Sequence, residues 1–278
     1  NRIDLLIISR YYPKIAFFVL SGVIYWLFKG NDTLNPVIVV WLFFLSTQLA
    51  IYLYVLLRLR PKFTHVKERL REAFRYNKVY GIHVYFGDLF STAFGALMPL
   101  LISRFSADNV DVGFYSLSLM LSSPLSYIPV VIATSHYAKF ANYKSIPKKL
   151  FLVTGGFSLF ALICLWVIVG PFVNIFYTPD FKPVIFLTFI TSVGTLLYSL
   201  SDFISRYLAS HGDGKALRNS SWIVGFTTLF LSLILIPKYK ATGASITHVV
   251  AGVVYILTII FYYFKRVKFN KTDASQIF

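Results

Sequence analysis

The sequence predicts an all-α, polytopic membrane protein with about eight transmembrane helices. Of its 278 residues, 57% are hydrophobic and only 14% are charged, and the charged residues lie between long apolar stretches. Soluble domains are about 25% charged, so this chain has too few charges to cover a globular surface. Disorder requires low hydrophobicity, and a disulfide scaffold requires more than the single Cys164, so both of these classes are excluded.

Long apolar stretches define the predicted spans, because a helix that crosses a membrane needs about 20 mostly apolar residues. Eight stretches qualify: 14–28, 36–57, 80–103, 112–135, 150–173, 183–205, 219–236 and 241–264. Prolines at 36, 183 and 237 lie at span edges, where helices tolerate them. The fourth stretch contains Pro124 and Pro129, which predict a kink that serves either as a bending gate or as fixed curvature.

The basic residues alternate between the two sides of this arrangement. Of the 27 lysines and arginines, 22 lie in segments 1–14, 58–78, 136–149, 206–218 and 265–278, and 5 lie in the intervening connections. Short loops rich in lysine and arginine stay in the cytoplasm, so both ends of the chain are predicted to be cytoplasmic. The net charge of +16 is therefore interpreted as a topology signal, and the alternation excludes a nucleic-acid-binding surface.

Two further features concern the organisation of the chain. Segment 59–80 is predicted to form a basic amphipathic helix, which either contacts anionic lipid head groups or has a specific regulatory role. The chain begins at Asn1 without an initiator methionine or a signal peptide, which predicts a piece of a longer polypeptide.

A polar stripe in the third predicted span is the first candidate site. Asp88, Ser91 and Thr92 lie at helical spacing on one face. A carboxylate inside a membrane is costly unless it faces a cavity or a partner. The stripe therefore predicts either a cavity that binds substrate or a coupling cation, or a buried hydrogen bond to a neighbouring helix.

The sixth and eighth spans carry the other candidates. The sixth contains a polar seam at intervals of three or four residues: Thr188, Thr191, Ser192, Thr195, Ser199, Asp202 and Arg206. Its hydroxyls can serve helix packing, Asp202 and Arg206 can pair locally, and Arg206 can instead extend to the interface. In the eighth span, His248 shares a face with Ala244 and Gly252, which favours a packed histidine over a proton carrier.

No signature of an enzyme or a metal site is present in the sequence. The chain lacks a glycine-rich phosphate loop, a zinc-binding spacing of histidine and cysteine, and a nucleophile elbow. We therefore predict that the protein is not an enzyme and holds no metal or cofactor, apart from H⁺ or Na⁺ as a coupling ion.

Four short segments resemble the polysaccharide transporter family, which comprises flippases of O-antigen and other lipid-linked oligosaccharides within the multidrug and oligosaccharidyl-lipid exporter superfamily. These segments are 112–119 (VGFYSLSL), 176–181 (FYTPDF), 209–215 (ASHGDGK) and 236–245 (IPKYKATGAS). In the last segment Lys240 stands where the family pattern has glycine, and in the second Thr178 does the same.

The resemblance implies a specific organisation. Residues 1–57 would hold the last two helices of an N-terminal lobe, 58–79 a basic cytoplasmic linker, 80–264 a complete six-helix C-terminal lobe, and 265–278 a basic cytoplasmic tail. It also implies location in the bacterial cytoplasmic membrane and function by alternating access. The transported molecule would be a polyprenyl-diphosphate-linked oligosaccharide, with membrane lipids and a polysaccharide polymerase machinery as partners.

Two alternatives remain open at this level. A multidrug antiporter of the same superfamily would use Asp88 to carry a proton or a sodium ion. A membrane polysaccharide polymerase is the weaker alternative, because the predicted outer connections have no more than about nine residues.

Overall fold

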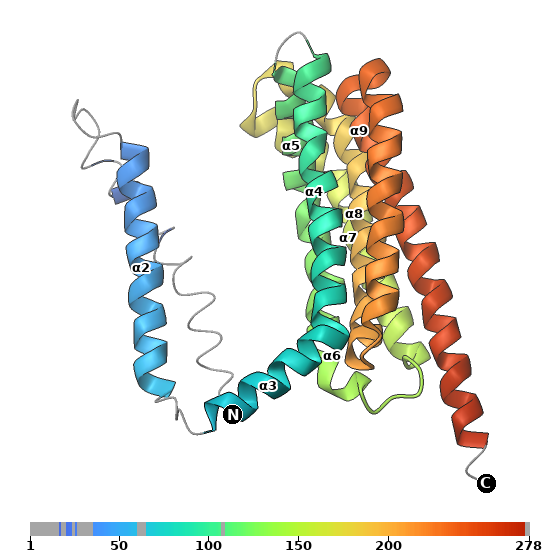
Figure 1. The fold of residues 1–278 in the computed structure, drawn as a ribbon. Coiled ribbons are helices and arrows are strands. Elements are labelled where there is room, and N and C mark those ends of the chain that lie inside the picture. The colour runs from blue at the N-terminus through green and yellow to red at the C-terminus, as the bar shows by residue number, and fades with distance from the viewer. Residues whose placement is uncertain are drawn as a thin grey trace. The chain divides into compact units, whose positions relative to one another are not determined.

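The computed structural model describes residues 17, 21–23, 26, 36–59, 65–106 and 109–275. These residues form helices joined by short turns, and the chain divides into two units, 1–70 and 71–278. Figure 1 shows the helices in chain order. The predicted first span, 14–28, lies mostly outside the described residues.

In the first unit, α2 (Pro36–Leu59) confirms the predicted span 36–57 as a helix. Large apolar side chains such as Trp41, Leu45 and Leu49 are exposed along it. The hydroxyls of Ser46 and Thr47 donate to the carbonyl oxygen of Phe43, so they do not need water as a partner.

A basic helix leads into the second unit. α3 (Val66–Tyr76) carries exposed charged residues, and it confirms that the described part of the predicted basic segment is helical. A single π-helical turn, η1 (Asn77–Gly81), joins it to α4 (Ile82–Phe105), the predicted third span.

The predicted fourth span is interrupted at its first proline. α5 (Val110–Ser122) ends in a 3-10 turn, η2 (Ser123–Ser126), and α6 (Tyr127–Phe140) follows. Pro124 lies in that turn, where its missing N–H does not break an α-helical hydrogen bond. The predicted irregularity is confirmed.

The helix α8 lies at the centre of the second unit. α7 (Lys148–Phe176) and the short turn η3 (Pro179–Phe181) precede α8 (Pro183–Ser210), which packs against α5, α6, α7 and α9. One buried cluster places Phe203 and Tyr207 of α8 against Phe140 and Ile259. The Tyr207 hydroxyl donates to the carbonyl oxygen of Lys144 at 2.8 Å, which anchors the connection between α6 and α7.

The last helix, α9 (Gly214–Ser275), has two arms that run antiparallel side by side (Figure 1). They meet at Lys240, which has the non-helical angles φ 48° and ψ −123°. The two arms confirm the predicted spans 219–236 and 241–264. A positive φ is normally taken by glycine, so Lys240 has a backbone conformation that L side chains rarely adopt. The Lys240 ammonium pairs with the Asp111 carboxylate at 3.4 Å.

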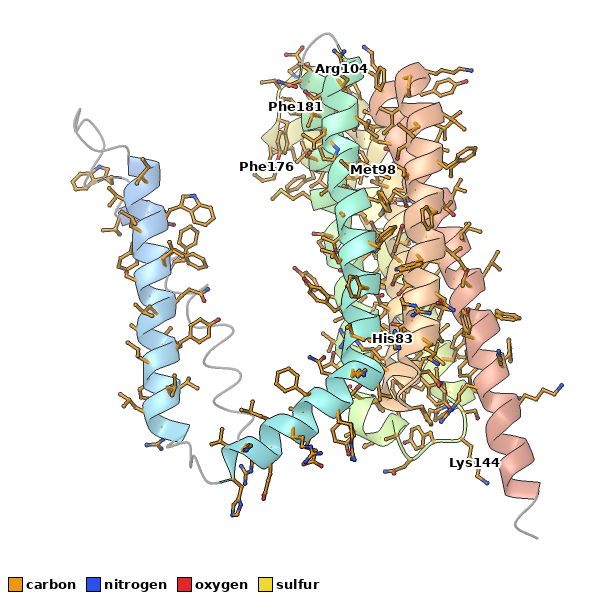
Figure 2. The ribbon with its side chains drawn as sticks, in the orientation of Figure 1. His83, Met98, Arg104, Lys144, Phe176 and Phe181 are labelled. Carbon is orange, nitrogen blue, oxygen red and sulfur yellow. The ribbon has the colours of Figure 1, made fainter. Side chains whose placement is uncertain are left out.

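The connections of the second unit gather at two ends. The α6–α7 connection, the α8–α9 turn and the C-terminal part of α9 lie at one end, which we call the basic end (Figure 1). His83 and Lys144 lie near it, whereas Arg104, Phe176 and Phe181 lie towards the opposite end (Figure 2). Within this unit the lysine- and arginine-rich segments therefore share one end, as their alternation along the sequence predicts.

Among the residues that the structure describes, six continuous helical stretches are long and apolar enough to cross a membrane, counting both arms of α9 as one. Many large apolar side chains on the outer faces of these helices are exposed, among them Leu152, Phe160, Val167 and Phe261. Such a surface suits lipid and not water. The protein is therefore an all-α, multi-pass membrane protein.

Candidate functional site

A polar cavity of about 300 Å³ lies between α4, α8 and the two arms of α9. It is lined by Asp88, Ser91, Thr92, Tyr198, Asp202, Ser221, Val224 and Tyr255. Four of these residues were candidates from the sequence: Asp88, Ser91, Thr92 and Asp202. The fold thus joins the stripe of the third predicted span to one member of the seam in the sixth.

The α4 stripe forms one wall of the cavity. Asp88 and Thr92 are exposed and Ser91 is half-buried. The neighbouring Gly87 is buried, and a Cβ atom there would lie 3.0 Å from the Cα of Arg218 and 3.3 Å from the Ser221 side chain. The absence of a side chain at this position lets α4 approach α9 closely, which brings the stripe next to Ser221.

Asp202 lies on the α8 wall and has a partner on α9. The Tyr255 hydroxyl donates to Asp202 Oδ1 at 3.2 Å. The rings of Tyr255 and Tyr198 lie 5.6 Å apart, so the two phenols form a continuous surface beside the carboxylate. Asp88 of α4 and Asp202 of α8 thus line one cavity from two different helices.

His248 and Thr195 lie beside the cavity and do not line it. His248 Nε2 and Thr195 Oγ1 are 3.3 Å apart, and the His248 ring stacks on Tyr198 at 5.0 Å. A Cβ atom on Gly194 would lie 2.5 Å from the His248 ring, and one on Gly252 would lie 3.1 Å from the Gly194 carbonyl oxygen. Small residues thus permit the close approach that the sequence predicted, and His248 is a packed, hydrogen-bonded histidine.

Two other seam residues of α8 lie outside the cavity. Ser199 is buried and donates to the Leu196 carbonyl oxygen within its own helix. Arg206 is exposed, and it forms no ion pair with Asp202 among the described residues. Neither Ser199 nor Arg206 lines the cavity.

The half of the seam farther from the basic end holds helices together. The hydroxyls of Thr191 and Ser122 lie 3.0 Å apart between α8 and α5. The Trp166 indole N–H donates to Ser192 Oγ at 2.9 Å from α7. These contacts agree with the interpretation that the hydroxyls pack helices together, because Thr191 contacts α5 and Ser192 contacts α7.

Tyr198, Ser221 and Tyr255 were missed by the sequence reasoning. One signal was available for each tyrosine: Tyr198 lies between Thr195 and Asp202 on the seam, and Tyr255 lies seven residues after His248, two helical turns along the same face. Nothing in the sequence marked Ser221, because its position depends on how α4 packs against α9.

The lining of the cavity determines its chemistry. Its polar atoms are carboxylate, hydroxyl and phenol oxygens, which can bind a proton or a hard cation and can form hydrogen bonds with a polar solute. Among the described residues, no group of three or more histidines, cysteines or acidic residues could hold a metal ion.

Comparisons with known proteins do not assign the chain. No family model matches it, and neither a curated protein nor a solved structure matches it.

Proposed function

We propose that the protein is a membrane transporter in which the cavity between α4, α8 and α9 binds a polar solute or its coupling ion. One observation supports this most directly: Asp88 and Asp202 line the same cavity within a bundle of apolar helices. An ionisable side chain inside a transmembrane helix is costly, up to roughly 2.5–3.5 kcal/mol at the helix centre on insertion scales. Two carboxylates that come from different helices and face one cavity are therefore best explained by a function that uses them.

For the transported molecule, we propose a polyprenyl-diphosphate-linked oligosaccharide carried across the bacterial cytoplasmic membrane, with the basic end in the cytoplasm. The four short segments that resemble the polysaccharide transporter family support this. The positive φ of Lys240 adds to it, because the backbone there has the conformation that the glycine of the pattern would adopt. Hydroxyl and phenol groups in the cavity suit the hydroxyls of a glycan.

The charge of the cavity indicates what Asp88 and Asp202 do in such a transporter. Carboxylates repel a diphosphate, so they do not hold the charged part of the lipid-linked substrate. We assign them to the coupling ion, H⁺ or Na⁺, whose binding and release would bias the exchange between the two access states. Ser91, Thr92 and Ser221 remain available to the solute.

A cation-coupled multidrug antiporter is the second candidate. The acidic lining favours it specifically, because the same two carboxylates would attract a cationic drug.

Deletion of the gene separates the two candidates. We expect deletion to abolish surface polysaccharide and to leave sensitivity to cationic drugs unchanged, with the polysaccharide restored by the wild-type gene on a plasmid. Increased drug sensitivity with normal polysaccharide would favour the antiporter. Normal behaviour in both assays would contradict both candidates, and extension of glycans by the purified protein would show a polymerase instead.

A further inference from the structure

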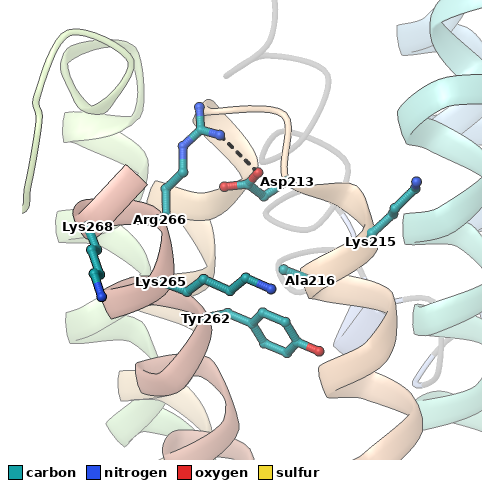
Figure 3. A pocket seen from close by; sticks show the side chains of 7 residues that line it. All are labelled: Asp213, Lys215, Ala216, Tyr262, Lys265, Arg266 and Lys268. Carbon is teal, nitrogen blue, oxygen red and sulfur yellow. Dashed lines mark hydrogen bonds and ion pairs between the residues drawn. The ribbon is translucent and has the colours of Figure 1, made fainter. Parts of the chain in front are cut away.

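A second pocket, of about 510 Å³, lies at the basic end. It is lined by Asp213, Lys215, Ala216, Tyr262, Lys265, Arg266 and Lys268 (Figure 3). None of these residues lines the cavity of Asp88 and Asp202, so the two sites are separate.

Two reversals of the chain build this pocket. Gly212 has a φ of 76°, which turns the chain after α8 and places Asp213 and Lys215 at the start of the first arm of α9. The reversal at Lys240 then brings the end of the second arm back beside them. Arg266 Nη1 and Asp213 Oδ1 form an ion pair at 3.3 Å that joins the two arms.

The charges of the pocket are strongly unbalanced. Four cationic side chains, Lys215, Lys265, Arg266 and Lys268, accompany the single carboxylate of Asp213. That carboxylate already faces Arg266 (Figure 3). Burial raises the pKa of Asp213, and the charges of Arg266 and His211 oppose that shift. Like charges gathered in one pocket repel each other, and a bound anion would relieve this repulsion.

The arrangement of the side chains suits a phosphate group. The Lys265 side chain extends across the pocket beside the Tyr262 ring, while Lys215 and Lys268 lie at its two edges, with Lys215 pointing away from Lys265 (Figure 3). The Tyr262 hydroxyl accepts a hydrogen bond from Asn219 Nδ2 at 3.2 Å, so it can still donate its own proton to a ligand oxygen. The volume falls within the range of about 300–1,000 Å³ that is usual for ligand pockets.

The need to keep lysines in the cytoplasm does not by itself explain this pocket. A topology signal requires basic residues in the loop and no particular geometry among them. Lys144, Lys148 and Lys149 lie at the same end of the unit and do not line the pocket, so they provide such charge without forming a site.

We propose that this pocket binds a phosphate or diphosphate group, supplied either by an anionic lipid head group at the membrane surface or by a soluble phosphate compound. Basic pockets between transmembrane helices at the cytoplasmic interface are suited to such head groups. The inference does not rest on the proposed transport function, since binding can be measured without transport.

The test uses the full chain in nanodiscs of phosphatidylcholine with or without phosphatidic acid. Native mass spectrometry counts the phosphatidic acid that each protein retains, and thermal unfolding in phosphatidylcholine alone measures stabilisation by inorganic pyrophosphate. The variant K265Q/K268Q removes two cations from the pocket. The variant K148Q/K149Q removes two cations from the same end outside it, and K265R/K268R keeps the charge.

We expect K265Q/K268Q to reduce binding of the effective probe about 25-fold, because each basic residue near a membrane surface contributes about a fivefold preference for anionic lipid. K148Q/K149Q and K265R/K268R should stay within about twofold of the wild type. Retention of phosphatidic acid that pyrophosphate does not displace identifies a lipid head group as the ligand, and stabilisation by pyrophosphate alone identifies a soluble phosphate. An equal loss in K265Q/K268Q and K148Q/K149Q, or no binding of either probe, would overturn the proposal.

Discussion

The cavity of Asp88 and Asp202 and the pocket at the basic end are both completed by α9, yet their charges are opposite. In the cavity, two carboxylates lie among hydroxyls and phenols from α4, α8 and α9. In the pocket, four cationic side chains and one carboxylate form the lining, and all of them come from α9 or the turn before it.

Polar groups are tolerated differently within an apolar helix and at its end. Within the helix bundle a charged group needs a partner inside the protein, so Asp202 receives the Tyr255 hydroxyl and close helix packing positions both groups. At the end of a span, lysine and arginine side chains can reach water, so their number is set by topology and their arrangement is less constrained. Basic side chains at such an end that also line a pocket and are held by an ion pair therefore indicate more than topology.

The largest expected effect tests the cavity. We expect Asp88→Asn to reduce transport about tenfold or more, because removal of a charged binding partner costs about 1.5–3 kcal/mol. Asp202→Asn should reduce it less, since the amide oxygen of asparagine can still accept the Tyr255 hydroxyl. Surface polysaccharide at matched protein level measures both.

Asp180→Asn, which removes a carboxylate from the exposed turn η3, is the matched control and should transport normally. Wild-type output from both cavity variants would contradict the assignment of the carboxylates.

The next effect tests whether close packing builds the cavity. Gly194→Ala should destabilise the protein by about 1–3 kcal/mol, because the added methyl group would collide with the ring and backbone of His248. Gly95→Ala should be neutral or stabilising by up to about 1 kcal/mol, since its Cβ meets open space and alanine is the better helix former. Unfolding free energies in mixed micelles measure both, and equal losses would show that the α8–α9 contact is not critical.

Ionic strength should distinguish the pocket from the cavity. Because exposed charges are screened by salt, raising NaCl from about 50 to about 500 mM should weaken phosphate binding at the basic end several-fold. K265Q/K268Q should lose most of this salt dependence. Binding that does not change with salt would show that hydrogen bonds, and not the excess of cations, hold the ligand.

The smallest effect concerns the reversal at Lys240, which both sites need because it returns the second arm of α9 alongside the first. Lys240→Gly should be about 1 kcal/mol more stable than Lys240→Ala, because both variants lose the ion pair with Asp111 and only glycine adopts the positive φ without strain. Thermal unfolding of the two variants measures the difference. Equal stability would show that the backbone at this position is not strained.

Much of this molecule could be predicted from sequence order alone. Seven of the eight predicted spans are helices in the structure, and span 14–28, which lies mostly outside the described residues, stays a prediction. It was also predictable that the basic connections of the second unit share one end. Both features depend on local properties, since the length of an apolar stretch and the charge of the loop beside it can be counted along the chain.

Only the tertiary structure decided which residues form a site. Asp88 and Asp202 are separate candidates in the sequence, and only the packing of α4 and α8 against α9 brings them to one cavity. Ser199 was a candidate on the same grounds, but it does not line the cavity and bonds within its own helix. Asp213 and Arg266 are 53 positions apart, and nothing in their local sequence predicts that they meet. The reason is physical: sequence periodicity determines the face of a helix on which a residue lies, but the packing of whole helices determines what that face meets.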